Sequence, residues 1–200
     1  MNLVTRFAAP LALALTIGGC SIGGLLGAGK PPPTLLTLTP EAAAVTTIRR
    51  SAAAGEVVTI SVPVVAKELR TIRVPVQVSY TEVAYVEDLQ WVDTPDRLFK
   101  DLLAETVRRT TSRVVLDQKQ AALDPGLVVS GQLQRFGYDA ATQAVIVQYD
   151  GALSTAGGTR VETRRFEARV PSGSDAMSVG VAINRAANQV ALEAASWIGG

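Results

Sequence analysis

A short apolar run near the N-terminus limits how much of this 200-residue chain takes part in its fold. The run covers residues 7–17 and follows a leader with one positive charge, at Arg6. It is shorter than the roughly 20 apolar residues that a membrane-spanning helix needs. A charged leader, an apolar core of this length and small residues after it are typical of a signal peptide. We therefore predict that residues 1–19 are a signal peptide and that the fold is made by the residues after it.

Cys20 comes directly after the predicted signal peptide and is the one cysteine of the chain. Together, Ile17, Gly18, Gly19 and Cys20 resemble the lipobox of bacterial lipoproteins, in which the cysteine is acylated and becomes the new N-terminus. A lone thiol has no disulfide partner within the chain, and lipidation would remove it. We predict lipidation at Cys20; an ordinary signal peptide with a stray cysteine is the alternative. Because Ser21 replaces the aspartate common in inner-membrane lipoproteins, the resemblance implies the inner leaflet of the outer membrane, facing the periplasm.

The mature chain divides into a tether and one domain. Residues 20–33 are rich in glycine and end in three prolines, so we expect a tether that is flexible at first and stiff near the domain. Residues 34–200 are enough for a single domain with its own core.

Charge and composition argue against several classes of function. Without Arg6, the mature chain has 18 basic and 18 acidic residues, so there is no basic excess for nucleic acid. The chain has no histidine, the commonest general base and metal ligand. Neighbouring carboxylates occur at Glu87 and Asp88 and near Asp93 and Asp96, where solvation or helix capping explains them. We expect no enzyme, no cofactor and no metal; an envelope hydrolase or sugar-binding enzyme that uses Glu87 or Asp88 is the alternative.

The apolar pattern predicts a mixture of strands and two main helices. Thr94, Pro95 and Asp96 form a strong helix start, followed by apolar residues at a spacing of three and four. A second helix begins after a capping box at Ser172 and Asp175, and small residues dominate its apolar stripe as far as Trp197. The β-rich runs cover residues 34–39, 57–65, 72–78, 81–86, 114–116, 127–136, 143–154 and 159–170.

The last three runs are predicted to form an antiparallel meander, because short loops with glycine join them. The fold class we predict is α+β, a mostly antiparallel sheet with two main amphipathic helices packed on one face.

Trp91 stands in a polar stretch just before the first helix and allows two interpretations. It is either an exposed aromatic anchor at a partner interface, where such residues are enriched, or a core residue beneath the helix. We keep Trp91 as a candidate partner-interface residue. Trp197 lies on the apolar stripe of the last helix, and we interpret it as packing.

Several segments, in this order, resemble the ABC-type transport auxiliary lipoproteins. They are the opening run at 34–38, the valine-rich run at 57–65, the residues around Trp91 at 89–95, the run 133–136 with Asp139, the run 144–153, the strand through Phe166, and Asp175 with the last helix. The resemblance covers roughly residues 34–198. It is loose at residues 41–55 and 67–87, where the family has a more recognisable element.

The resemblance implies a non-enzymatic accessory of an ABC-type, MCE-linked lipid-transport system between the inner and outer membranes. Its implied partners are an MCE-domain lipid-binding protein and the ABC permease and ATPase, together with the membrane that holds the lipid anchor. An outer-membrane assembly or scaffold lipoprotein, supporting the insertion of lipopolysaccharide or envelope proteins, is the alternative. Self-association is left open.

Overall fold

The computed structural model describes residues 34–44, 51–53, 56–117, 119–120, 126–155 and 160–200. The chain divides into two units, residues 1–31 and 32–200, and every described strand and helix belongs to the second. The predicted signal peptide, Cys20 and the tether up to residue 33 lie outside the described residues.

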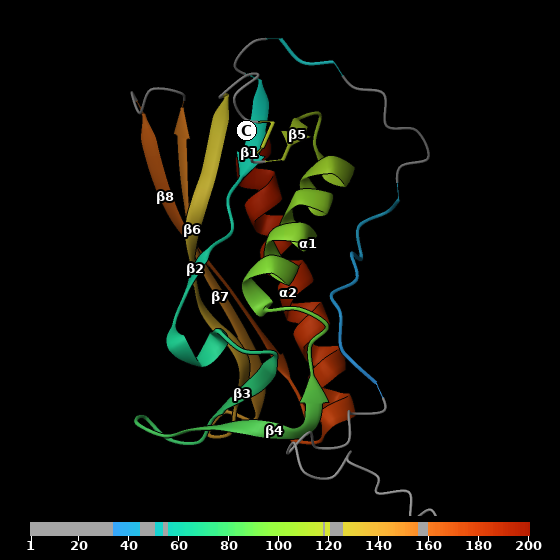
Figure 1. Cartoon of the computed structure of the whole chain (residues 1–200), viewed down its shortest axis with the longest axis vertical. Coiled ribbons are helices and arrows are strands. Elements are labelled where there is room, and N and C mark those ends of the chain that lie inside the picture. Colours follow the sequence, from blue (N-terminus) through green and yellow to red (C-terminus); the bar gives the residue numbers. More distant parts are fainter. Residues whose placement is uncertain (1–33, 45–50, 54–55, 118, 121–125, 156–159) are drawn as a thin grey trace, which may run out of the picture. The chain divides into compact units, whose positions relative to one another are not determined.

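One long strand, β6 (Leu127–Asp139), organises the sheet. Along one edge it pairs antiparallel with β7 (Ala144–Thr155), which pairs antiparallel with β8 (Val161–Pro171). This confirms the predicted meander (Figure 1). A register shift between Leu133 and Arg135 marks an irregularity in β6.

Three short strands share the other edge of β6, and all three run parallel to it. They are β1 (Val57–Ile60), β2 (Val64–Val65) and β3 (Arg73–Gln77), which meet β6 one after another along its length. Outside them, β5 (Val114–Leu116) pairs parallel with β1, and β4 (Val83–Gln90) pairs antiparallel with β3. A short 3-10 helix, η2 (Lys67–Leu69), lies between β2 and β3.

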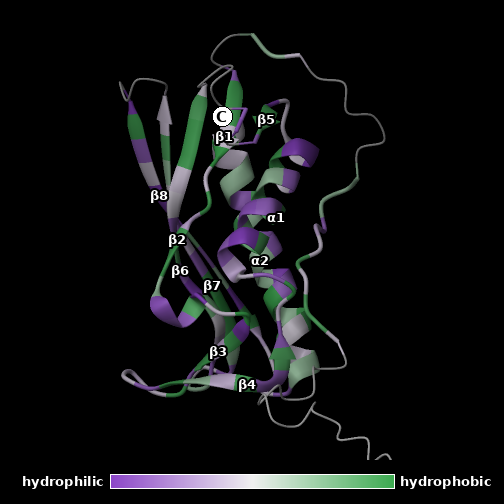
Figure 2. Ribbon diagram, in the orientation of Figure 1, coloured by the Kyte–Doolittle hydropathy of each residue, from purple (hydrophilic) through white to green (hydrophobic). Residues whose placement is uncertain are grey.

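The sheet therefore has eight strands in mixed orientation, and the prediction of a mostly antiparallel sheet is wrong. The run at 57–65 forms two strands instead of one, because the chain leaves the ladder between Ile60 and Val64, around Pro63. Proline cannot donate to a ladder hydrogen bond, which favours such a break. Figure 2 shows hydrophobic residues in β1 and in the part of β6 that pairs with it.

Two helices cover one face of the sheet, as predicted: α1 (Pro95–Thr110) and α2 (Ala176–Gly199). Helix α1 begins at the predicted proline, although the Thr94 side chain makes no capping bond. Helix α2 is capped by Asp175, whose Oδ1 accepts a hydrogen bond from the Ser178 N–H at 2.9 Å. The predicted capping box at Ser172 is wrong, since the helix starts directly after Asp175.

A line of six aromatic rings runs through the core between the sheet and the helices. Centroids of successive rings lie 5.1 to 6.4 Å apart, in the order Trp91, Phe136, Phe99, Tyr149, Phe166 and Trp197. Aromatic pairs at such distances stabilise a core beyond the area that they bury. Around them, small alanines of α2 allow the helix to approach the sheet closely.

The N-terminal segment was predicted as a strand but lies outside the ladder apart from one parallel bridge between Leu36 and Trp91. From there residues 34–44 run beside α2, where side chains of the helix replace a strand as partners. The Thr39 N–H donates to Asn184 Oδ1 at 2.9 Å, and the Glu41 N–H donates to Asn188 Oδ1 at 2.8 Å.

Candidate functional site

Trp91, the predicted candidate for a partner interface, is buried. Its side chain is 1% exposed, and its ring packs 5.5 Å from Phe136. The Trp91 N–H donates to the Ile72 carbonyl at 2.7 Å, so the backbone is also fixed. Of the two interpretations, the burial matches the core residue beneath the first helix, and the ring offers no surface to a partner.

The neighbouring carboxylates named from the sequence do not converge. Glu87 and Asp88 are exposed on β4, where Asp88 has a positive φ of 54° within an irregular part of the strand. Asp93 lies just before α1, and its Oδ1 accepts a hydrogen bond from the Thr94 N–H at 2.7 Å. Among the described residues, no group of three or more acidic or cysteine side chains gathers to hold a metal ion.

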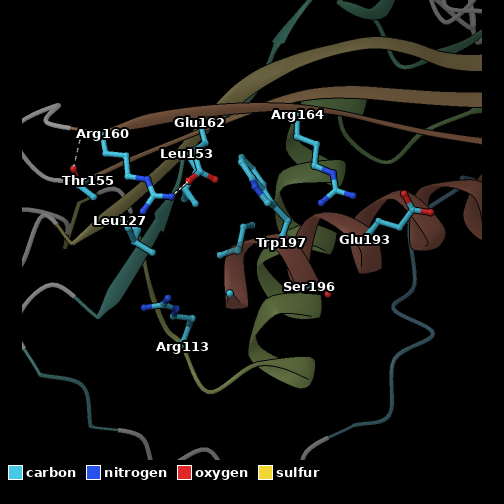
Figure 3. A pocket seen from close by; sticks show the side chains of 12 residues that line it. Arg113, Leu127, Leu153, Thr155, Arg160, Glu162, Arg164, Glu193, Ser196 and Trp197 are labelled. Atoms are coloured by element: carbon cyan, nitrogen blue, oxygen red, sulfur yellow. Dashed lines mark hydrogen bonds and ion pairs between the residues drawn. The ribbon is translucent and has the colours of Figure 1, made fainter.

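An open pocket of about 660 Å³ lies where β6, β7 and β8 pass the C-terminal end of α2 (Figure 3). Its lining joins charged and apolar side chains from segments far apart in the sequence. The charged members are Arg113, Arg160, Glu162, Arg164 and Glu193, and the large apolar ones are Leu127, Leu153, Trp197 and Ile198.

The alternation of β8 explains how charged residues reach this pocket. Every second residue of β8 points to the face of the sheet that the helices cover. The buried residues on that face are Phe166, Ala168 and Val170, and Glu162 and Arg164 point to the same face. At their end of β8, however, α2 stops at Gly199, and these two side chains line a pocket instead of a core. The sequence analysis did not predict this pocket. The one indication of it was that Arg164 lies two residues before Phe166 in β8 and therefore points to the same face of the sheet.

The ring of Trp197 lines the pocket, and behind it the buried ring of Phe166 packs with a centroid distance of 5.6 Å. The Arg164 guanidinium lies 5.4 Å from the Phe166 ring centroid, a distance at which cation–π attraction operates. Figure 3 shows Arg164 extending from β8 toward the part of α2 that holds Trp197 and Glu193.

The charges of the pocket are only partly neutralised. Arg160 forms an ion pair with Glu162, whereas no ion pair joins Arg164 or Glu193 to another described residue. The pocket thus offers opposite charges beside an apolar wall. This is the chemistry of binding a molecule or surface with both polar and apolar parts.

The opposite face of the sheet, which no helix covers, is polar and internally paired. The Arg165 guanidinium donates to both oxygens of Asp150, at 2.7 and 2.8 Å, and these bonds hold the pKa of Asp150 below its ordinary value. The Gln134 amide donates to the same carboxylate at 3.3 Å. This face therefore has its charges satisfied within the domain, in contrast to the pocket.

None of the helices that the structure describes is long and apolar enough to cross a membrane.

Solved structures share this fold. A protein from Xanthomonas campestris, assigned to the family DUF330, is 18% identical; the match covers 84% of this chain and 92% of that one, with a TM-score of 0.65. An uncharacterised protein is 15% identical over 73% of this chain and 94% of its own, with a TM-score of 0.62. PelC from Paraburkholderia phytofirmans, described as a dodecamer, is 16% identical over 77% and 96%, with a TM-score of 0.47. At these identities the first two show the fold alone.

No curated protein is similar enough to the chain to count as a relative. The resemblance indicated by the ordered segments is nevertheless confirmed, because the sequence model of one family matches residues 36–195. That range includes every described strand and helix of the domain except the last residues of α2. The chain belongs to the family of ABC-type transport auxiliary lipoprotein components.

Proposed function

We propose that this protein is a non-enzymatic, periplasm-facing accessory of an MCE-linked lipid-transport system of the ABC type. The family match over residues 36–195 is the observation on which the proposal depends. The pocket beside Trp197 supports it, since a charged rim and an apolar wall suit lipids or a lipid-handling partner. The partners in the proposal are an MCE-domain lipid-binding protein and the ABC permease and ATPase.

The proposal includes acylation at Cys20 and residence in the inner leaflet of the outer membrane. Two or more acyl chains hold a protein firmly, whereas one gives only marginal binding. Metabolic labelling with an alkyne palmitate analogue tests this, with Cys20→Ser as the variant that loses the label. Fractionation then locates the labelled protein, and recovery with the inner membrane would contradict the placement.

Crosslinking in living cells tests the partners. A photo-crosslinking residue at Glu193, on the rim of the pocket, is compared with one at Thr163, which is exposed on the helix-free face of β8. We expect an MCE-domain protein or its permease to be captured from Glu193 and not from Thr163. Capture of outer-membrane assembly proteins alone would favour the scaffold function instead.

A further inference from the structure

Exposed apolar side chains gather at the end of the domain where the described chain begins. Leu35, Val92, Met177 and Val181 are all at least half exposed, and Met177 reaches 81%. Single exposed apolar residues are normal on a protein surface, but a group of them marks an interaction site. We call these four residues the entry patch.

Backbone contacts place the members of the entry patch around one point. The Leu36 N–H donates to the Gln90 carbonyl at 2.7 Å, and the Val92 N–H donates to the Leu36 carbonyl at 2.9 Å. The Leu36 side chain in turn lies 3.0 Å from where a Cβ of Gly180 would stand. Leu35 and Val92 are thereby held beside the first turns of α2, which contain Met177 and Val181.

The outer ridge of α2 continues the patch with a positive charge. Met177, Val181 and Arg185 follow one another at a spacing of four, so their side chains share one face of the helix. Arg185 is exposed and forms no ion pair with another described residue. Apolar side chains next to such a cation suit the boundary between acyl chains and phosphate headgroups.

The β3–β4 hairpin adds a second apolar element at the same end. Figure 1 shows β4 crossing the end of the domain at which α2 begins. Between β3 and β4 the hairpin presents Tyr80, which is 99% exposed, flanked by the exposed Val78 and Val83. Tyrosine is enriched at membrane–water interfaces, because its ring is apolar and its hydroxyl is polar.

The two ends of α2 differ in character. From Val181 to Trp197 the helix rises about 24 Å, which separates the entry patch from the pocket. At the pocket end the exposed apolar residues Val161 and Leu192 stand next to charged ones, Arg160, Glu162 and Glu193. Of these two ends, the entry end is the one that combines apolar exposure with closeness in sequence to the predicted anchor.

The length of the chain before the domain indicates which surface the entry patch contacts. Thr34 lies 14 residues after Cys20, a stretch that spans at most about 50 Å when fully extended. A tether this short keeps the domain at a high effective concentration near the bilayer, so a weak apolar contact is enough to hold one face against it. We propose that the entry patch rests on the phospholipid surface and that the pocket beside Trp197 faces away from it. This inference relies on the lipid anchor of the proposed function, but not on its transport partners.

Cysteine labelling of the intact, acylated protein tests the orientation. Acylated Cys20 has no free thiol, so an introduced cysteine is the one reactive site in the chain. Val181→Cys and Val161→Cys form a matched pair, because the two side chains are 62% and 61% exposed and Val161 lies next to the pocket residues Arg160 and Glu162. Each variant is labelled with an environment-sensitive fluorophore and reconstituted into phosphatidylethanolamine–phosphatidylglycerol vesicles that carry a nitroxide on the lipid headgroup.

We expect the label at position 181 to shift its emission to the blue and to lose intensity to the nitroxide lipid, while the label at 161 keeps the emission that it has in water. Equal quenching at the two positions would overturn the inference. So would a blue shift at 181 in the unacylated domain, residues 34–200, in buffer without vesicles or detergent, which would point to a second copy of the chain on the patch.

A charge substitution provides an independent measurement. Met177→Asp is introduced into the labelled Val181→Cys protein, and we expect quenching by the nitroxide lipid to fall because a carboxylate resists transfer to the interface. The same protein with Val161→Asp serves as the control and should keep its quenching. Co-flotation with the vesicles separates the two proposals. Failure to float contradicts the lipid anchor, whereas flotation with unchanged quenching in Met177→Asp contradicts the membrane contact.

Discussion

The Leu36 side chain lies 3.0 Å from the position that a Cβ atom would take on Gly180. Glycine in the interior of a helix costs stability relative to alanine, so its presence in the second turn of α2 has a local reason. The missing side chain admits Leu36, and the N-terminal segment of the described chain thereby packs on the helix.

Filling that space should detach the segment. Gly180→Leu places a branched side chain where Leu36 now packs, and overpacking of this kind costs about 1–3 kcal/mol. We expect a lower urea midpoint and faster proteolysis between residues 36 and 44. Val181→Leu, on the exposed side of the same turn, is the control and should leave both unchanged. An unaltered midpoint for Gly180→Leu would show that the segment is not held by this contact.

Asn188 should matter more than Asn184, although both bind the same segment. The Asn188 side chain is buried; it accepts from the Glu41 N–H at 2.8 Å and donates to the Thr39 carbonyl at 2.9 Å. Asn188→Ala leaves both backbone groups without a partner, which costs about 1–3 kcal/mol. At the more exposed Asn184, water can replace the lost bond to Thr39. Urea unfolding of the two alanine variants gives the comparison, and equal losses would contradict it.

Asp139 should stabilise the domain in a pH-dependent way. Burial alone would raise its pKa, but hydrogen bonds from Arg135 at 2.6 Å and from the Thr142 N–H and hydroxyl at 2.9 Å outweigh burial and hold the pKa below its ordinary value. A lowered pKa in the folded state means that the stabilisation is present above the unfolded value and is lost as the pH falls through the folded one.

We therefore expect Asp139→Asn to cost about 2 kcal/mol at neutral pH, where the carboxylate is charged. The difference in unfolding free energy between wild type and variant should shrink below about pH 4, since wild-type Asp139 is then protonated first in the unfolded state. Urea unfolding over a series of pH values measures it. Asp101→Asn, on an exposed carboxylate paired with Lys100, is the control, and a difference that stays constant with pH would contradict the assignment.

The two tryptophans should report on different parts of the protein. Trp91 is fully buried, whereas Trp197 is half-buried and lines the pocket. In Trp91→Phe, the remaining emission should be quenched by iodide and shifted by a short-chain phospholipid that enters the pocket. In Trp197→Phe, the emission should be blue and insensitive to both. A lipid response that survives in Trp197→Phe would place the binding elsewhere.

Local signals in the sequence predicted the parts of the fold that depend on local chemistry. Pro95 after Thr94 located the start of α1, and the alternation in β8 placed Phe166 inside and Arg165 outside. Local signals did not predict which strands pair. β1, β2 and β3 are short, and nothing within them indicates that all three run parallel to one edge of β6. The mixed sheet therefore could not be deduced from their patterns.

The pocket was missed for a similar reason. In the sequence, Arg164 and Arg165 look like a solvated pair, yet they point to opposite faces of the sheet, where Arg165 binds Asp150 and Arg164 lies over Phe166. Telling them apart requires knowing where α2 ends relative to β8, which is a property of packing. For Trp91 the sequence left both a partner interface and the core open, and its place in the line of aromatic rings shows that it belongs to the core.

The shared edge of β6 also determines the order in which strands can pair during synthesis. β1, β2 and β3 leave the ribosome well before Leu127–Asp139, the strand whose edge they share, so β2 has no partner until then and β1 and β3 can pair only with β5 and β4. Pairings of such large sequence separation form slowly, and waiting edges are prone to aggregate. A chain built in this way gains from remaining unfolded until its whole length has been made. It also resists division, because a fragment that ends before Leu127 lacks the strand that joins β1, β2 and β3 into one sheet.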